Sequence, residues 1–283
     1  MTGSRPRVTV VTNGNYFASL GLGPLLGAAP GRLDVQVLVT TGLRRQHGNR
    51  LVEVWQLARR WGWRYFGYKA ATHVIPKAGR ALRLGGPGEV TTLCERAGIP
   101  VQTARNVNDP GPTAAVRRFD PDLLVSFSCP YRIGSRLLAV PRIGCLNVHS
   151  SLLPSYAGIC TYVHVLADGC GETGVTVHEM VDELDAGRIV AQRRIAIPGR
   201  TSTFALFSQQ CRLAGELLLE AVQSALADGR LVGEPQDLSR RSYRGEPTAA
   251  DVDGLRRRGH RLMTSADVLA FLRGPAAMSS GRA

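Results

Sequence analysis

Two polar side chains stand two residues apart at the end of a hydrophobic run. They are Asn147 and His149, in the segment Ile143 to His149 (IGCLNVH). The run has the character of a buried strand, and side chains at positions i and i+2 of a strand point the same way. An amide can donate to a developing oxyanion, and an imidazole that titrates near pH 7 can carry a proton. The alternative is that both side chains only bond to the backbone of the following loop.

A second polar segment contains a carboxylate that could complete such a site. Asp182, Glu183 and Asp185 lie between a strand-like stretch around Val175 and Val177 and a second stretch that begins at Ile189. An acidic loop between two strands is usually a solvated turn. Asp185, however, stands between Leu184 and Ala186, which suits a carboxylate that points inward.

The elements that must position these residues follow an alternating pattern. Strands are predicted at Arg7 to Thr12, Leu33 to Thr41, Leu123 to Phe127 and Ile143 to His149, and helices at Val90 to Ala97 and Thr113 to Phe119. Strands that alternate with helices predict an open, mostly parallel, Rossmann-like α/β sheet. Such sheets bind ligands at the carboxyl ends of their strands, where Asn147 and His149 are expected.

Two further segments frame this sheet. Apolar residues at helical spacing predict a helical insert over residues 49–79. It would pack on the sheet or on a second subunit of a homodimer, cover a substrate cleft, or contact a membrane surface. A long helix is predicted at Thr203 to Leu226 and a last one at Ser265 to Leu272. We expect a domain over residues 1–200 and a C-terminal helical extension over residues 201–283.

Both polar segments, in this order, resemble the folate-dependent formyltransferase family. Asn147-Val148-His149 and Ser151-Leu152-Leu153-Pro154 match one family motif, and Leu184-Asp185-Ala186-Gly187 matches a second. The resemblance covers about residues 5 to 200 and implies that Asn147, His149 and Asp185 are catalytic. In this family's chemistry Asn147 would stabilise a tetrahedral oxyanion, His149 would donate a hydrogen bond or proton to it, and Asp185 would orient His149. No metal is implied.

The resemblance also implies a site for the co-substrate N10-formyltetrahydrofolate. Its residues would come from the stretch after the third predicted strand, from the turn after His149 and from the acidic loop. They are Cys129, Pro130, Tyr131, Arg132, Ile133, Ser151, Leu152, Leu153, Pro154, Val181, Asp182 and Leu184. The chain departs from the family at Ala157, where an arginine is frequent.

The expected reaction is transfer of a formyl group to the primary amine of a small molecule, such as an amino sugar, an amino acid derivative or a biosynthetic intermediate. A methionyl-tRNA formyltransferase-like enzyme is the alternative, although the segment after Arg200 is short and helical in pattern. A non-catalytic folate-binding protein is a second alternative. A nucleic-acid partner is a weaker one.

The composition of the 283-residue chain rules out a disordered chain and a small disulfide-rich protein. The net charge is +13, and arginine supplies all positive charges except Lys69 and Lys77. A basic surface favours anionic ligands such as the glutamate tail of folate, a phosphate or nucleic acid. No apolar run approaches the roughly 18 residues of a membrane span, and the six cysteines form no C-x-x-C pair. We therefore expect a cytoplasmic protein with reduced thiols.

Overall fold

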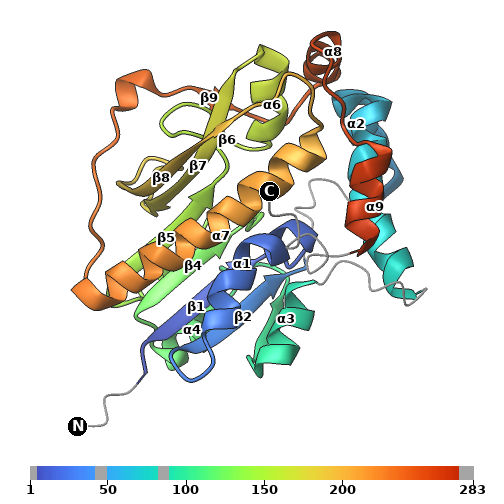
Figure 1. Cartoon of the computed structure of the whole chain (residues 1–283). Helices are drawn as coiled ribbons and strands as arrows, with labels where there is room; N and C mark the ends of the chain where they lie inside the picture. Colours follow the sequence, from blue (N-terminus) through green and yellow to red (C-terminus); the bar gives the residue numbers. More distant parts are fainter. Residues whose placement is uncertain (1–4, 42–49, 82–88, 274–283) are drawn as a thin grey trace, which may run out of the picture.

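A seven-stranded sheet forms the centre of the computed structural model, which describes residues 5–41, 50–81 and 89–273 (Figure 1). The strand order is β3-β2-β1-β4-β5-β7-β8. The neighbouring strands β3, β2, β1, β4 and β5 pair in parallel. Strand β7 is antiparallel to both β5 and β8. The strands are β1 (Arg7–Thr12), β2 (Asp34–Thr40), β3 (Val101–Ala104), β4 (Leu123–Phe127), β5 (Gly144–His149), β7 (Glu172–Glu179) and β8 (Ile189–Ala196). The prediction of an open, mostly parallel α/β sheet is confirmed.

Helices cover both faces of this sheet, and each face has its own core. The helices are α1 (Tyr16–Ala28), α2 (Arg50–Ala81), α3 (Val90–Ala97), α4 (Pro110–Phe119), α5 (Ser135–Leu138), α6 (Thr161–Asp168), α7 (Thr203–Asp228), α8 (Ala249–Arg257) and α9 (Ser265–Arg273). Val10 of β1 packs in the larger core with α1, α3 and α7, and Val11 packs in the smaller core with α4 and α5. Neighbouring β1 side chains thus enter opposite cores, as the pleat of a strand requires.

Helices α1 and α7 lie together on the larger core because glycines allow a close approach. A Cβ atom on Gly215 of α7 would lie 2.5 Å from the carbonyl oxygen of Gly21, and one on Gly21 would lie 1.9 Å from the ring of Phe127. The glycines at 21, 23 and 27 therefore belong to a packed helix and form no phosphate-binding turn after β1. Helix α1 was not predicted, since its glycines and Pro24 lower the local helix propensity.

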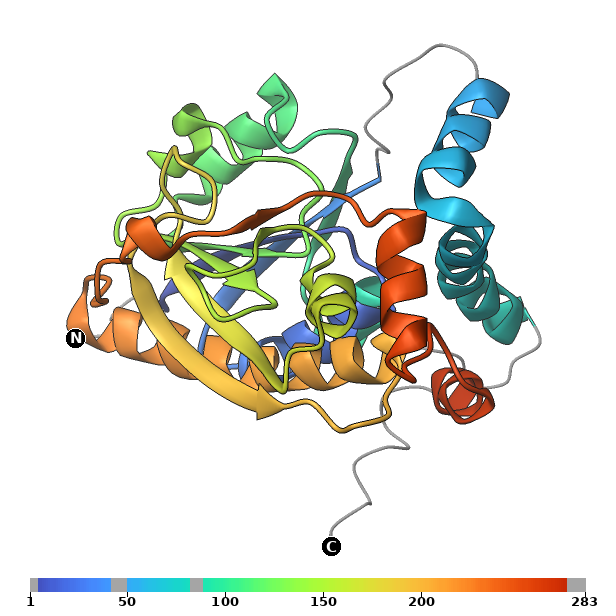
Figure 2. The same ribbon diagram turned by 90° about the horizontal axis from the view of Figure 1, so that it is seen from above.

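The insert is helical, as predicted, but it is broken into two parts. Gly62 has φ 75° and ψ 148°, which interrupts α2 in its middle. Tyr65 and Tyr68 are buried in the larger core, whereas Trp55 and Trp63 are 53% and 70% exposed. The insert lies beside α8 and α9 at one end of the molecule (Figure 2). No helix in the described part of the chain is both long and apolar enough to cross a membrane.

The C-terminal extension contains the two expected helices and also an extended segment. Helix α7 ends at Asp228, and the chain then runs to α8 through a short 3-10 helix (Leu238–Arg240) and the strand β9 (Tyr243–Arg244). β9 pairs in parallel with β6 (Ala157–Gly158) in a separate two-stranded sheet. The wholly helical reading of the extension was thus incomplete, because this part is held by contacts with distant residues. The domain boundary at residue 200 stays a prediction.

Candidate active site

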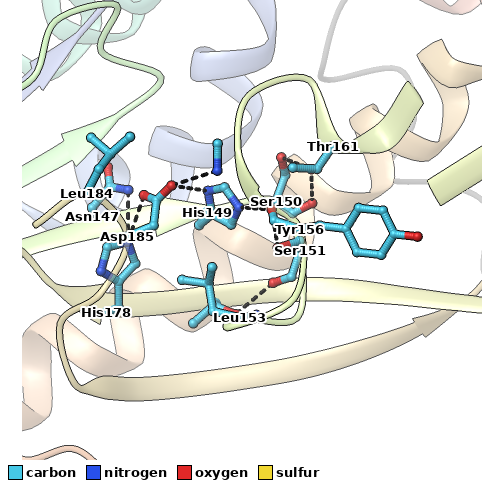
Figure 3. A network of polar contacts seen from close by, with 12 residues as sticks. Asn147, His149, Ser150, Ser151, Leu153, Tyr156, Thr161, His178, Leu184 and Asp185 are labelled. Atoms are coloured by element: carbon cyan, nitrogen blue, oxygen red, sulfur yellow. Dashed lines mark hydrogen bonds and ion pairs between the residues drawn. The ribbon is translucent and has the colours of Figure 1, made fainter. Parts of the chain in front are cut away.

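Asn147 and His149 lie at the end of β5, where the sheet changes from parallel to antiparallel pairing. Asn147 is opposite Ser126 of β4 and His178 of β7, and His149 is opposite Thr176. Their side chains project toward the same region, as the strand period requires (Figure 3). The imidazole of His149 is buried, whereas Asn147 is partly exposed.

Asp185 brings a carboxylate to this pair from the loop between β7 and β8. Its side chain is only 8% exposed, so it points inward as expected. Oδ2 accepts a hydrogen bond from the backbone nitrogen of Gly158 at 2.9 Å and lies 3.8 Å from Nδ1 of His149. Oδ1 lies 3.6 Å from Nε2 of His178. One carboxylate therefore stands between two histidines (Figure 3).

His178 is the fourth polar side chain of the cluster, and its surroundings fix its tautomer. Nδ1 donates to the carbonyl oxygen of Glu179 at 2.8 Å, because a carbonyl can only accept. Nε2 is then the acceptor for the amide nitrogen of Asn147 at 3.1 Å. Burial lowers the pKa of His178 to about 4, with Asp185 acting in the opposite direction. His178 is therefore a neutral acceptor that orients the amide of Asn147.

His149 is oriented by the loop that follows it. Nε2 donates to the carbonyl oxygen of Tyr156 at 2.8 Å, which leaves Nδ1 facing the carboxylate of Asp185. In the neutral imidazole, Nδ1 carries no proton in this arrangement. Nδ1 of His149 and Oδ2 of Asp185 therefore face each other at 3.8 Å.

The loop between β5 and α6 has a tightly determined shape. The hydroxyl of Ser151 donates to the carbonyl oxygens of Ser155 and Tyr156 at 2.9 and 3.1 Å. The backbone nitrogen of Leu153 donates to the hydroxyl of Thr176 at 3.2 Å. Tyr156 has φ 56°, a left-handed conformation that costs of order 1–3 kcal/mol for a non-glycine residue. Asp185, with φ 54°, lies in the same left-handed region, and both residues adjoin His149.

The expected folate-binding residues lie on the three loops around this cluster. Arg132 connects two of them, since its guanidinium donates to the carbonyl oxygen of Asp182. Val181 and Leu184 are each 41% exposed beside Asp185, and Ile133 is buried in the smaller core with Cys129 and Tyr131 packed at its edge. The turn residues Ser151 and Leu153 are buried, and Leu152, Pro154, Pro130 and Asp182 are partly or fully exposed.

Three other residues near the cluster have clear positions. Ala157 is fully buried in β6, which pairs with β9. His164 is buried in α6, where its Nε2 donates to the carbonyl oxygen of Gly245 at 2.9 Å. His178 lies inside the cluster.

Two contributors to the cluster had no signal in the sequence. Tyr156 acts through its carbonyl oxygen, which any residue has. Gln236 donates to the carbonyl oxygens of Asp185 and Gly187 at 3.0 and 2.6 Å, from a position 51 residues after Asp185. No local pattern could relate these two segments.

Comparison with known proteins shows the family and the fold of the chain. The sequence model of the formyl transferase family matches residues 73–222, more than half of the chain. An N-formyltransferase from Helicobacter canadensis, solved with folinic acid and dTDP-3-aminofucose, is 14% identical with a TM-score of 0.58, over 90% of this chain and 81% of that one. A 4-N formyltransferase from Francisella tularensis is 14% identical with a TM-score of 0.57, over 90% and 88%. A sugar N-formyltransferase from Shewanella is 15% identical with a TM-score of 0.53, over 89% and 87%.

At these identities the solved structures show a shared fold. The match to the family model includes the loop after β4 as well as Asn147, His149 and Asp185. The chain belongs to the formyl transferase family.

Proposed function

We propose that this protein transfers the formyl group of N10-formyltetrahydrofolate to the primary amine of a small molecule, with an amino sugar as the first candidate. The observation that carries the proposal is the position of the Asp185 carboxylate. It lies 3.8 Å from Nδ1 of His149 on the strand that also presents Asn147, in a chain of the formyl transferase family. This arrangement supplies an oxyanion donor and a proton-holding pair in one place.

Asn147 would stabilise the negative charge that develops on the formyl oxygen. One N–H of its amide is taken by Nε2 of His178 at 3.1 Å. Among the described residues, the other N–H has no hydrogen-bond partner, so it can donate to an oxygen of the substrate. Donors that are fixed before the reaction stabilise an oxyanion without reorganisation cost, and loss of one such donor typically slows catalysis by about 10² to 10³.

His149 and Asp185 would hold the proton that the attacking amine loses, and that proton would pass to N10 of the folate when the bond between N10 and the formyl carbon breaks. Nε2 of His149 is occupied by the carbonyl oxygen of Tyr156, so a proton is gained at Nδ1, beside Oδ2 of Asp185. The resulting imidazolium would place positive charge near the oxyanion. Catalytic hydrogen bonds frequently shorten when substrate binds, so a separation of 3.8 Å between Nδ1 and Oδ2 suits this role.

The loops around the cluster have the chemistry to hold a folate. Val181 and Leu184 present exposed apolar side chains next to Asp185, and such surface suits an aromatic ring system. The backbone of Leu153 is fixed by Thr176 and Gln192, so the turn from Ser151 to Pro154 would form a rigid wall. Arg132, 62% exposed, could meet a carboxylate of the glutamate tail. When bound, the folate supplies the activated formyl group.

The acceptor is proposed to be an amino sugar because of the ligands bound in the structure of one relative. The Helicobacter canadensis enzyme was solved with dTDP-3-aminofucose, and its chain and this one share most of their length. The helical insert and the region 240–262 would shape the acceptor side of the site. A tRNA acceptor and folate binding without turnover are the competing outcomes.

The test has a binding arm and a turnover arm. In the first, the purified protein is titrated calorimetrically with 5-formyltetrahydrofolate, beside Asn147→Ala and Asp185→Ala variants. One-site binding by the wild type would support the folate site, and no binding at high protein concentration would contradict it. In the second, N10-formyltetrahydrofolate is incubated with nucleotide-linked amino sugars, free amino sugars, amino acids and methionyl-tRNA. Folate binding without transfer to any amine would favour a non-catalytic protein.

A further inference from the structure

A segment near the C-terminus crosses both loops of the candidate site. We name residues 234–246 the C-terminal strap. It starts with paired backbone hydrogen bonds between Glu234 and Ile189, at 2.8 and 2.9 Å, and continues into β9 beside β6. In Figure 2 it runs as an orange to red-orange band from the region of β8 to α8. The strap lies after residue 222, where the match to the family model ends.

The first part of the strap holds the Asp185 loop by its backbone. Nε2 of Gln236 donates to the carbonyl oxygens of Asp185 and Gly187 at 3.0 and 2.6 Å. Nη2 of Arg241 donates to the carbonyl oxygen of Leu184 at 2.6 Å, and its other terminal nitrogen pairs with the carboxylate of Glu183. Three carbonyl groups of one short loop are thus bound by two strap side chains.

The second part of the strap holds Tyr156, whose carbonyl oxygen orients His149. The hydroxyl of Ser242 accepts the backbone N–H of Tyr156 at 2.8 Å, and its carbonyl oxygen accepts that of Ala157 at 2.8 Å. The guanidinium of Arg244 lies 5.6 Å from the centre of the Tyr156 ring and pairs with Asp168 at 2.6 Å. Asp168 in turn accepts the Tyr156 hydroxyl at 2.8 Å.

Each loop contains a non-glycine residue with left-handed backbone at the site, and such a conformation depends on its surroundings. Asp185 and Tyr156 have φ values of 54° and 56°. Non-glycine residues persist in this region only when their surroundings determine it. Without the strap, each residue could relax, and the contact between Asp185 and His149 would lengthen.

We propose that Gln236 is a positioning residue, which sets the Asp185 carboxylate against His149 by donating to the carbonyl oxygens of Asp185 and Gly187. It touches no reacting group. Its importance for catalysis rests on the proposed function, but the geometric claim can be tested without substrate. If Gln236 were only structural, its loss would lower the stability of the protein alone. If it positions Asp185, its loss also changes the environment of the His149 imidazole.

The test reads the imidazole of His149 directly. The ¹⁵N chemical shifts of Nδ1 and Nε2 are measured in uniformly labelled full-length protein at pH 8, with His149→Gln for assignment. Wild type is compared with Gln236→Ala, Asp185→Asn and the double variant. We expect Gln236→Ala to move the His149 shifts in the direction of Asp185→Asn, by at least half as much. In the Asp185→Asn background, Gln236→Ala should add little, since the carboxylate it positions is gone.

Three controls separate donation from packing and from unfolding. Gln236→Glu keeps the side chain's size but replaces the donor by an acceptor, so it should reproduce the shift of Gln236→Ala. Gln223→Ala, at an exposed position of α7, should leave the His149 shifts unchanged. If Gln236→Ala does not fold, Arg241→Ala gives the same test through Leu184.

Unchanged His149 shifts in a folded Gln236→Ala variant would overturn the proposal, as would a wild-type spectrum for Gln236→Glu. With an acceptor from the screen, kcat of Gln236→Ala should fall about 10- to 100-fold, the range that misplacement of a catalytic group can cost. If the His149 shifts respond to Gln236→Ala as expected but the wild type transfers no formyl group, the proposed function is refuted and the positioning role of Gln236 remains.

Discussion

The amide nitrogen of Asn147 lies 3.1 Å from Nε2 of His178, and this contact fixes both side chains. Because Nδ1 of His178 already donates to the carbonyl oxygen of Glu179, Nε2 can only accept. The amide of Asn147 must then turn its nitrogen, and not its oxygen, toward His178. The same nitrogen retains one N–H for a substrate oxygen, so His178 determines what Asn147 can offer.

Replacement of the amide should slow transfer without unfolding the protein. Asn147→Ala removes the proposed oxyanion donor, and we expect kcat to fall by about 10² to 10³. Asn147 is partly exposed at the end of β5, so the loss of stability should be small. Single-turnover transfer to the acceptor found in the screen, with thermal unfolding as a control, measures both effects. A variant with wild-type kcat would remove Asn147 from the mechanism.

Stability should depend on pH through His178. Burial lowers its pKa from 6.5 to about 4. Between these pH values His178 is therefore protonated in the unfolded chain and neutral in the folded protein. The contribution of His178 to the free energy of unfolding is complete above pH 6.5 and is lost as the pH falls toward 4. The linkage relation gives about 3 kcal/mol for this contribution. Urea unfolding between pH 7 and 4 should show a smaller loss for His178→Gln than for wild type.

The control for this measurement is His73→Gln, which changes an exposed histidine of α2. Its pH profile should follow that of wild type. Equal slopes for wild type and His178→Gln over this range would mean that His178 takes up its proton as readily in the folded protein as in the unfolded chain. The lowered pKa of His178 would then be wrong.

The contact between α1 and α7 should tolerate no side chain at Gly215. A Cβ there would lie 2.5 Å from the carbonyl oxygen of Gly21 and 3.0 Å from the ring of Pro24. Gly215→Ala should therefore lower the free energy of unfolding by roughly 1–3 kcal/mol, as overpacking does. Gly67→Ala, where a Cβ meets nothing within 4 Å, should raise it by up to about 1 kcal/mol. Urea denaturation of both variants measures whether their free energies of unfolding change in these opposite directions.

Loss of the Arg132 side chain should weaken folate binding. Arg132 holds the loop after β4 against Asp182, and its charge is exposed toward solvent. We expect Arg132→Ala to raise the Kd for 5-formyltetrahydrofolate roughly tenfold, the equivalent of one lost polar contact. Calorimetry at two salt concentrations should also show a weaker salt dependence than in wild type. Arg136→Ala, a neighbouring exposed arginine, provides the comparison.

The sequence by itself determined most strands of the central sheet, but not β3 (Val101–Ala104), and it pointed to the polar residues Asn147, His149 and Asp185. Runs such as Arg7 to Thr12 and Leu123 to Phe127 are apolar and β-branched, and they became β1 and β4 with the same bounds. The alternation around Asn147 and His149 placed both side chains on one side of a strand. Flanking apolar residues correctly indicated that Asp185 points inward. These are local properties, set by side-chain period and burial within a few residues.

Only the tertiary structure decided which residues complete the site. His178 meets Asn147 because β7 pairs antiparallel with β5 in one particular register. Gln236 meets the Asp185 loop because the strap returns across it after α7. Helix α1 forms despite its glycines and Pro24 because α7 and β4 pack against it. Each of these depends on contacts between segments far apart in the chain, where burial and hydrogen bonding outweigh local propensity.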